Sequence, residues 1–414
     1  MRNHYAPVIC FCCFLIFFCN IGLPSTSFNV FQPYIAAQPW MGDSMASAVV
    51  AVRTFVSLIC MFLVGKFVEL LGARYAASIA ACLTAVAFFV YGLAKSVPVM
   101  MLGSVLAGAG YGLGGMVIVT LVTRKWFAEG VGKALGLATA GSGAASLLLP
   151  PIVARVIENS SLTWGFWFQT GVGLVCATLI FALLRNDPAE MGYQPFVPAK
   201  RGGVSGETTA PAQPNAKSSG LAEPLPKSAL AILVFGVLCI ACVCVDGYNY
   251  FGILLTSEGV STLTAASIVA VLGLSLTVGK LISGVVIDRI GTFAGCLILF
   301  GIIIAGLVCA CLSGRGGAFP YLAAVLFGSG ATLGSVGISL WSMELSTPEN
   351  LTSMVKNLQV CYAGGGFLFS IVPGVLMDVC GSYVVSYVIL LVLAVVSAVT
   401  VSSVYLRYKR GVTR

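Results

Sequence analysis

Long apolar runs alternate with short polar segments along the whole chain. Each run is about 20 residues or longer, the length that an α-helix needs to cross the hydrocarbon core of a bilayer. The pattern predicts an all-α membrane protein with twelve transmembrane helices. We place them at residues 7–31, 44–65, 75–94, 98–123, 133–158, 164–184, 228–252, 263–284, 293–312, 318–343, 353–377 and 383–406.

One polar segment is much longer than the others. Residues 185–227 are rich in Pro, Gly, Ser, Ala and Thr and have no apolar period, which is typical of a flexible linker. The segment divides the chain into three predicted parts. These are an N-terminal six-helix bundle at 1–184, a linker at 185–227 and a C-terminal six-helix bundle at 228–414.

The two halves share a sequence repeat. Gly65–Arg74 and Gly284–Gly291 are charged islands between apolar runs, and both contain the frame Gly, three residues, an acid, two residues, Gly. The first glycines of the two frames, Gly65 and Gly284, are separated by roughly half of the chain. Other positions recur at nearly the same separation: Asn29 and Asn249, Gly108 and Gly328, Gly114 and Gly334, Lys133 and Lys356, Gly143 and Gly366, Pro150 and Pro373. A twofold repeat of six helices each is typical of parallel-repeat transporters.

Composition and charge support a membrane location. The 414 residues are 58% hydrophobic and 9% charged, whereas a soluble protein is about 25% charged. The net charge of +8 could suggest a nucleic-acid partner, but the basic residues lie at the ends of apolar runs. Most of them fall on the side of both termini, so we predict that this side is cytoplasmic and that the protein spans the plasma membrane. The apolar run within Met1–Asn20 has no convincing cleavage site, so we interpret it as the first span.

Several motifs that suggest other chemistry are better explained by packing. Cys239 and Cys242 have metal-ligand spacing, but their neighbours are apolar and His4 is the one histidine of the chain. Gly110–Gly115 contains Gly-x-Gly-x-x-Gly without the βαβ unit that a dinucleotide site needs, and small residues at this spacing let membrane helices approach closely. We find no Walker motif and no catalytic constellation. We therefore expect no enzyme activity, metal, cofactor or nucleic-acid partner.

The charged islands are candidate gating elements. The residues concerned are Gly65, Glu69, Arg74, Gly284, Asp288 and Arg289. An acid at a helix end can pair with a base or interact with a neighbouring helix start, and a pair that breaks and forms again can favour one open state over another. The alternative is a solvated turn whose charges contribute about 1 kcal/mol. Because the frame occurs twice at equivalent places, we favour the gating role.

The islands resemble the Gly-x-x-x-Asp-Arg-x-Gly-Arg signature of the major facilitator superfamily, although the first copy has Glu69 and Leu70 in place of Asp and Arg. Residues 187–195 resemble the Pro-Glu-x-x-Gly-x-x-Pro stretch that follows helix 6 in that family. Three further stretches resemble the oxalate/formate antiporter and monocarboxylate transporter branch: 125–143, 27–33 and 373–383. Trp164-Gly165 departs from the Trp-Arg of many relatives. The resemblance covers the whole chain and implies a secondary transporter that works by alternating access.

The branch resemblance implies a small organic anion as substrate, a monocarboxylate or short dicarboxylate, with proton symport or anion exchange. Arg53 lies near the middle of a predicted span, where a charge costs about 2.5–3.5 kcal/mol on the insertion scale. We therefore expect it to face a water-filled cavity, with a structural ion pair as the alternative. Gly279-Lys280 resembles the Gly-Arg of the organic-anion branch, and Lys280 could instead snorkel to the surface. Tyr111, Tyr248 and Tyr362 are further substrate-binding candidates, although each could simply pack.

Two other ionisable residues need a separate interpretation. Asp246 is the proton-coupling candidate, and it could equally cap a helix end or pair with a cation. Lys356 matches Lys133 in the repeat, so we predict that it lies at the membrane surface, while the deeper lysine of oxalate-carrying relatives falls near Gly364.

Other functions on this fold remain open. The runner-up is an exporter of amphipathic drugs or metabolites, and a transporter-like sensor is a third possibility. Expected partners are the organic anion, a coupling proton or counter-anion and the lipid bilayer, and we expect a monomer.

Overall fold

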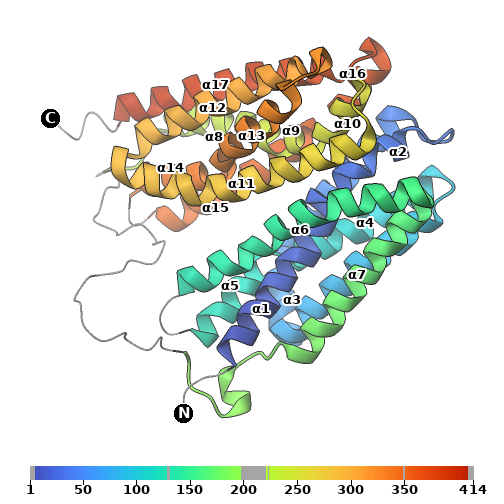
Figure 1. Ribbon diagram of the computed structural model, residues 1–414. Coiled ribbons are helices and arrows are strands. Elements are labelled where there is room, and N and C mark those ends of the chain that lie inside the picture. The colour runs from blue at the N-terminus through green and yellow to red at the C-terminus, as the bar shows by residue number, and fades with distance from the viewer. Residues whose placement is uncertain (1–4, 128–130, 197–220, 222, 348–349, 409–414) are drawn as a thin grey trace. The chain divides into compact units, whose positions relative to one another are not determined.

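A computed structural model describes residues 5–127, 131–196, 221, 223–347 and 350–408. Their regular structure is helical (Figure 1), apart from one isolated parallel bridge between Phe127 and Phe196. The predicted all-α membrane fold is confirmed. Within these residues, eleven helical stretches are long and apolar enough to cross a membrane, and one of them, the 52-residue α3, turns in the middle and supplies two spans.

The elements of the first half follow the predicted order. They are α1 (Ala6–Phe17), η1 (Phe18–Thr26), η2 (Phe28–Val30), α2 (Gln32–Ala36), α3 (Gly42–Leu93), α4 (Val97–Leu113), α5 (Met116–Trp126), α6 (Val131–Asn159), α7 (Leu162–Leu183) and η3 (Pro188–Met191).

The second half repeats this plan with more interruptions. Its elements are α8 (Lys227–Ala241), η4 (Cys242–Asp246), α9 (Gly247–Asn249), α10 (Phe251–Ser257), α11 (Thr262–Ile290), α12 (Thr292–Cys311), η5 (Ser313–Arg315), α13 (Phe319–Gly330), η6 (Ala331–Gly334), α14 (Val336–Glu344), α15 (Leu351–Phe369), α16 (Val372–Cys380) and α17 (Val384–Tyr408).

Helices continue past Gly65 and Gly284 to the last glycine of each frame, which corrects the predicted helix ends at residues 65 and 284. The turns occur instead at Gly72 (φ 77°, ψ 158°) and Gly291 (φ 87°, ψ 155°). Positive φ is accessible to glycine at little cost, and such a residue commonly ends a helix. The two islands therefore end on the same backbone conformation, in agreement with the sequence repeat.

The repeat also extends to breaks inside the spans. The π-helix η1 in the first span and the π-helix η4 in the seventh overlap when the two halves are aligned with Asn29 on Asn249. The fourth span is interrupted after Gly114, between α4 and α5. The tenth is interrupted at the equivalent Gly334, between η6 and α14. Similar interruptions at matching positions confirm two six-helix repeats.

The chain forms two compact units whose division differs from the repeat boundary. The first comprises the described residues of Met1–Phe28 and Phe55–Ala216, and the second those of Asn29–Thr54 and Lys217–Arg414. The second unit thus includes the start of α3, from the first half of the sequence. The start of α3 belongs to the second unit because it contacts residues of that unit. Tyr383 donates a 2.6 Å hydrogen bond to Asp43, and the backbone of Gly374 packs directly against Ser47.

The core of the first unit is built from small and aliphatic side chains. Ala76, Ala77 and Ala81 of α3 are fully buried in one cluster with residues of α1, α5, α6 and α7, since small residues let membrane helices approach closely. Cys12 and Cys13 of α1 lie in the same cluster as free thiols, which fits their interpretation as soft packing residues.

Candidate functional site

A π-helical turn in the seventh span carries the buried acid of the second unit. Asp246 is the last residue of η4 and is 0% exposed. Within the described residues, neither of its carboxylate oxygens has a hydrogen-bond partner. Since π-helical turns are rare and are frequent at functional sites, and since a buried unpartnered carboxyl is costly, this residue is the starting point of the site.

Glycines of α15 fix the position of this turn. The thiol of Cys242 donates a 3.2 Å hydrogen bond to the carbonyl of Gly365. A Cβ atom on Gly366 would lie 2.8 Å from the side chain of Val245. Only residues without a side chain allow η4 and α15 to approach this closely, so the glycine run of the repeat positions Asp246.

A buried cation acts on Asp246. Arg53 lies on the part of α3 that belongs to the same compact unit and is 5% exposed, and its charge interacts with that of Asp246. Tyr250 is buried beside them and is affected by both charges. Its hydroxyl donates to the carbonyl of Ser370. A nearby opposite charge offsets part of the cost of burying each ion, which explains how Arg53 is accommodated in the middle of a span.

The charge of a second cation acts on the same turn. Lys280 of α11 is exposed and interacts electrostatically with Cys244, whose thiol hydrogen-bonds the backbone of Gly334. A Cβ atom on Gly334 would lie 2.3 Å from the hydroxyl oxygen of Tyr362. The described part of the second unit thus places Lys280 and Tyr362 around the middle of η4, while Arg53 lies near its end.

The other aromatic candidates differ in their positions. Tyr248 is buried next to η4, and its carbonyl accepts a 2.8 Å hydrogen bond from the amide of Asn29. Tyr111 is half-buried on α4 of the first unit. Lys356 lies in the second turn of α15, and its side chain is outside the described part of the structure. A Cβ atom at Gly364 would meet no atom within 4 Å.

Of the predicted gating residues of the first island, Arg74 contacts α7 and the segment that follows it. The backbone N–H of Arg74 donates to the side chain of Asn186 at 2.8 Å, and its Nε donates to the carbonyl of Phe181 at 2.8 Å. The guanidinium also lies 4.7 Å from the centre of the Phe181 ring. Glu69 is exposed and makes no ion pair with a described residue, and Gly65 is an exposed residue within α3.

The predicted gating residues of the second island lie at the end of α11. Gly284, Asp288 and Arg289 all belong to the last turns of α11. Arg289 is exposed, whereas the side chain of Asp288 is outside the described part of the structure.

Sequence reasoning missed a polar cluster at the start of α3. Tyr383 donates to Asp43, and the backbone N–H of Ser44 donates to Asp378 at 3.2 Å. Burial, and then the neighbouring Asp43 carboxylate, raises the pKa of Tyr383, so its hydroxyl remains a donor at neutral pH. Asp43 and Ser44 directly precede an apolar run, which could have suggested a helix start, but nothing local indicates their partners.

Glu344 was also missed. It lies at the end of α14 and accepts hydrogen bonds from Thr292 at 2.5 Å and from Tyr405 at 2.9 Å. Thr292 is the first residue of α12, where a carboxylate is favourable near the positive end of the helix dipole. Glu344 therefore links three helices of the second unit.

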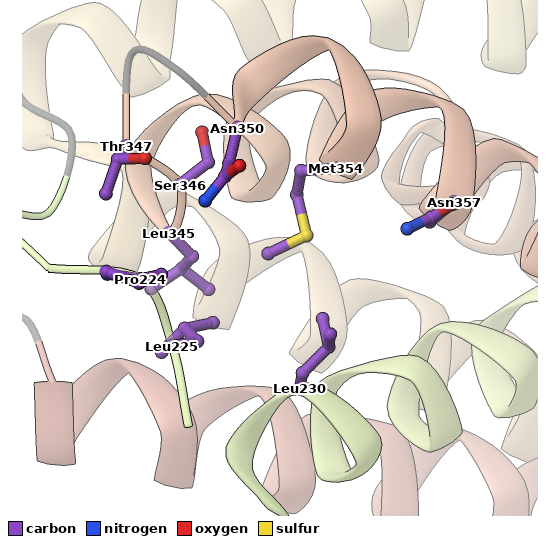
Figure 2. A pocket seen from close by; sticks show the side chains of 9 residues that line it. All are labelled: Pro224, Leu225, Leu230, Leu345, Ser346, Thr347, Asn350, Met354 and Asn357. Atoms are coloured by element: carbon purple, nitrogen blue, oxygen red, sulfur yellow. The ribbon is translucent and has the colours of Figure 1, made fainter. Parts of the chain in front are cut away.

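A small pocket lies elsewhere in the second unit, near the start of α8 and the end of α14 (Figure 2). It encloses about 130 Å³, and Figure 2 shows Met354, Leu225 and Leu230 pointing toward its centre. Beside it, the N–H of Leu221 donates a 3.0 Å hydrogen bond to the carbonyl of Ser346. None of the predicted site residues lines this pocket, and its apolar centre fits the packing of the linker end.

Comparison with known proteins identifies the class. The family model for the Major Facilitator Superfamily matches residues 9–370. The chain therefore belongs to the Major Facilitator Superfamily and is a multi-pass membrane transporter. Among curated proteins, it is 23% identical over 338 residues to the agnestins efflux protein AgnL12 of Paecilomyces divaricatus, covering 78% of this chain and 70% of that protein.

Solved structures with the same fold include transporters of different substrates. A variant of the nucleoside transporter NupG has a TM-score of 0.74 at 14% identity, covering 97% of this chain and 100% of that one. A D-xylose-proton symporter has a TM-score of 0.70 at 16% identity, covering 97% of each. A bacterial homolog of the human lysosomal transporter Spinster has a TM-score of 0.69 at 15% identity, covering 99% and 98%. Identities this low establish the fold and leave the substrate open.

Proposed function

We propose that this protein is a secondary active transporter of a small organic anion, a monocarboxylate or short dicarboxylate, that works by alternating access. One observation carries the proposal: within one compact unit, the charges of Arg53 and Lys280 act on Asp246 and Cys244 of a single π-helical turn. Two cations and one acid give a net charge of +1 when the carboxyl group is ionised and +2 when it is protonated. In either state the site favours an anion.

The acid supplies a route for coupling to protons. The carboxylate of Asp246 and a substrate carboxylate compete for the charge of Arg53. A proton on Asp246 removes the competitor, so proton binding raises the affinity for the substrate, and substrate binding raises the affinity for the proton by the same factor. This reciprocity supports proton symport. In anion exchange, a second substrate anion would instead replace the first on the two cations.

The remaining roles follow the same proposal. Tyr362 and Tyr248 of the second unit would donate hydrogen bonds to the substrate. The islands that end at Gly72 and Gly291 would form gates. We place the protein in the plasma membrane as a monomer, with both termini in the cytoplasm.

Export of an amphipathic metabolite is the second candidate function. It is favoured by the similarity to an efflux protein and by the interaction of Arg53 with Asp246, which could neutralise both charges permanently. In that case the ion pair would be structural, and the substrate would bind to apolar surfaces. The two candidates differ in whether the charge of Arg53 is needed for recognition.

Transport measurements in proteoliposomes distinguish the candidates. We expect uptake of formate, lactate or oxalate that increases with an inward proton gradient. Arg53→Gln or Lys280→Gln should lower it about 10- to 100-fold, because a hydrogen bond to a charged group contributes about 1.5–3 kcal/mol. Lys95→Gln and Arg155→Gln are matched controls, because they remove the same charges from exposed positions of the first unit: Lys95 lies between α3 and α4, and Arg155 lies near the end of α6. If no carboxylate moves, and the two site variants export an amphipathic substrate normally, the anion proposal fails.

A further inference from the structure

A second cavity lies on the side of the second unit formed by α11, α12 and α13. It has a volume of about 460 Å³, within the range of about 300–1,000 Å³ of ligand pockets. Its lining is mostly aliphatic and includes Val278, Ile282, Val286, Ile298 and Val325. This cavity, which we call the groove, shares no lining residue with the site around η4.

The exposed aliphatic residues that α11 contributes to this cavity lie on the face of the helix opposite to Lys280. Val278 and Ile282 are each two residues from Lys280, which corresponds to a rotation of about 200° around a helix with 3.6 residues per turn. Their side chains are 42% and 56% exposed. An ammonium group in a membrane span faces protein or water and avoids hydrocarbon. The exposed apolar face on the other side of the helix is therefore the one that contacts lipid.

The groove extends along about two thirds of the thickness of the hydrocarbon core. Its α11 residues run from Leu274 to Ile287, about 20 Å at a rise of 1.5 Å per residue, compared with about 30 Å for the whole hydrocarbon core. The groove ends close to the turn at Gly291, on the side that the distribution of Lys and Arg predicts to be cytoplasmic. It therefore includes the depth of the leaflet next to that side.

A basic residue lies on the same face of α11, beyond the end of the groove. Arg289 is three residues after Val286 and seven after Ile282, a spacing that places residues on one face of a helix. It is exposed in the last turn of α11. The cytoplasmic leaflet carries anionic lipids, and a basic residue near its surface contributes about 1 kcal/mol of attraction.

We propose that this groove binds an acyl chain of an anionic phospholipid whose headgroup phosphate is held by Arg289. The aliphatic walls exclude water and match a hydrocarbon chain, and the cation selects the charge of the headgroup. The assignment is independent of the transported substrate, because the exposed aliphatic residues of α11 in the groove lie opposite to Lys280.

Photochemical labelling in vesicles tests the site. The full-length protein is reconstituted in phosphatidylcholine with a small fraction of phosphatidylglycerol that carries a diazirine on one acyl chain. We expect labelled peptides to concentrate on residues 274–287 and 298–302. Ile282→Trp, which fills the groove, should abolish most of this labelling, while Val399→Trp, at an exposed position of α17, should leave it unchanged. Unlabelled phosphatidylglycerol should compete better than phosphatidylcholine, and Arg289→Gln should reduce this preference about fivefold.

Three results would overturn the proposal. Labelling spread evenly over exposed apolar residues of α17 and α11 would indicate bulk lipid alone. Crosslinks between two copies of the chain through α11 would indicate a protein interface in place of a lipid. Equal competition by the two lipids would show that the charge of the headgroup does not contribute to binding. Because Ile282→Trp could disturb folding, native mass spectrometry of the unchanged protein must also retain phosphatidylglycerol in preference to phosphatidylcholine.

Discussion

The π-helical turns η1 and η4 occupy equivalent places in the two repeats but differ in their chemistry. When Asn29 is aligned with Asn249, Thr26 falls at the position of Asp246. The hydroxyl of Thr26 donates a 2.8 Å hydrogen bond to the carbonyl of Gly22 within its own helix. Asp246 is also buried, and its carboxylate oxygens have no such partner among the described residues. The backbone irregularity is thus common to both repeats, whereas the ionisable group belongs to the second.

The neighbours of the two turns differ in the same way. In the first unit, Asn20 of η1 donates to the carbonyl of Gly114 at 3.3 Å and accepts a 3.2 Å hydrogen bond from Thr84. These neutral groups satisfy one another across three spans. In the second unit, the equivalent Gly334 lies against Tyr362 and Cys244, close to Lys280. The first turn therefore holds helices together, whereas in our proposal the second exchanges a charged ligand.

The largest expected effect comes from removing the charge that distinguishes the two turns. Asp246→Asn mimics a permanently protonated acid, so Arg53 remains available to the substrate at every pH. We expect gradient-driven accumulation in proteoliposomes to fall about 100-fold, because proton release is lost, while exchange of labelled for unlabelled substrate persists. The affinity for the substrate at high pH should equal that of the unchanged protein at low pH. Accumulation that still follows the proton gradient in this variant would exclude Asp246 as the coupling residue.

Much of the scaffold could be predicted from the sequence. The span predicted at 293–312 corresponds to Thr292–Cys311, and that at 164–184 to Leu162–Leu183, because the bilayer requires long apolar runs. Arg53 and Asp246 could be recognised as candidate site residues, because a charge inside such a run costs free energy and is therefore a functional-site hypothesis by default.

The details that build the site could not be predicted. An apolar run does not determine whether a turn is α- or π-helical, because both satisfy the backbone inside the helix. The interaction of Arg53 with Asp246 joins residues far apart in sequence, and so does the hydrogen bond from Tyr383 to Asp43. Such pairs depend on how the helices pack, and the repeat gives no clue to them because neither pair has a counterpart in the other half.

An intermediate effect is expected from the neutral network of the first unit. Asn20→Ala removes both hydrogen bonds of the side chain and leaves the hydroxyl of Thr84 with its 3.2 Å bond to the carbonyl of Ala80. We expect a loss of about 1–3 kcal/mol in the free energy of unfolding, measured by thermal or denaturant unfolding of the purified protein. The substrate affinity of the variant that remains folded should be unchanged. A selective loss of substrate affinity without loss of stability would contradict the structural role of η1.

The smallest effect should come from Thr26, the counterpart of Asp246. Thr26→Val keeps the shape of the side chain and removes one hydroxyl group. The carbonyl of Gly22 still accepts a 2.9 Å hydrogen bond from the backbone N–H of Ser27, so no buried group is left unpaired. Because a hydrogen bond contributes about 0.5–1.5 kcal/mol and the acceptor of this one stays satisfied, we expect a loss of about 0.5 kcal/mol in the free energy of unfolding and gradient-driven uptake at the level of the unchanged protein. If Thr26→Val instead lowered uptake as strongly as Asp246→Asn, the two turns would act together in transport, and the functional difference between the repeats would have to lie in Arg53 and Lys280 alone.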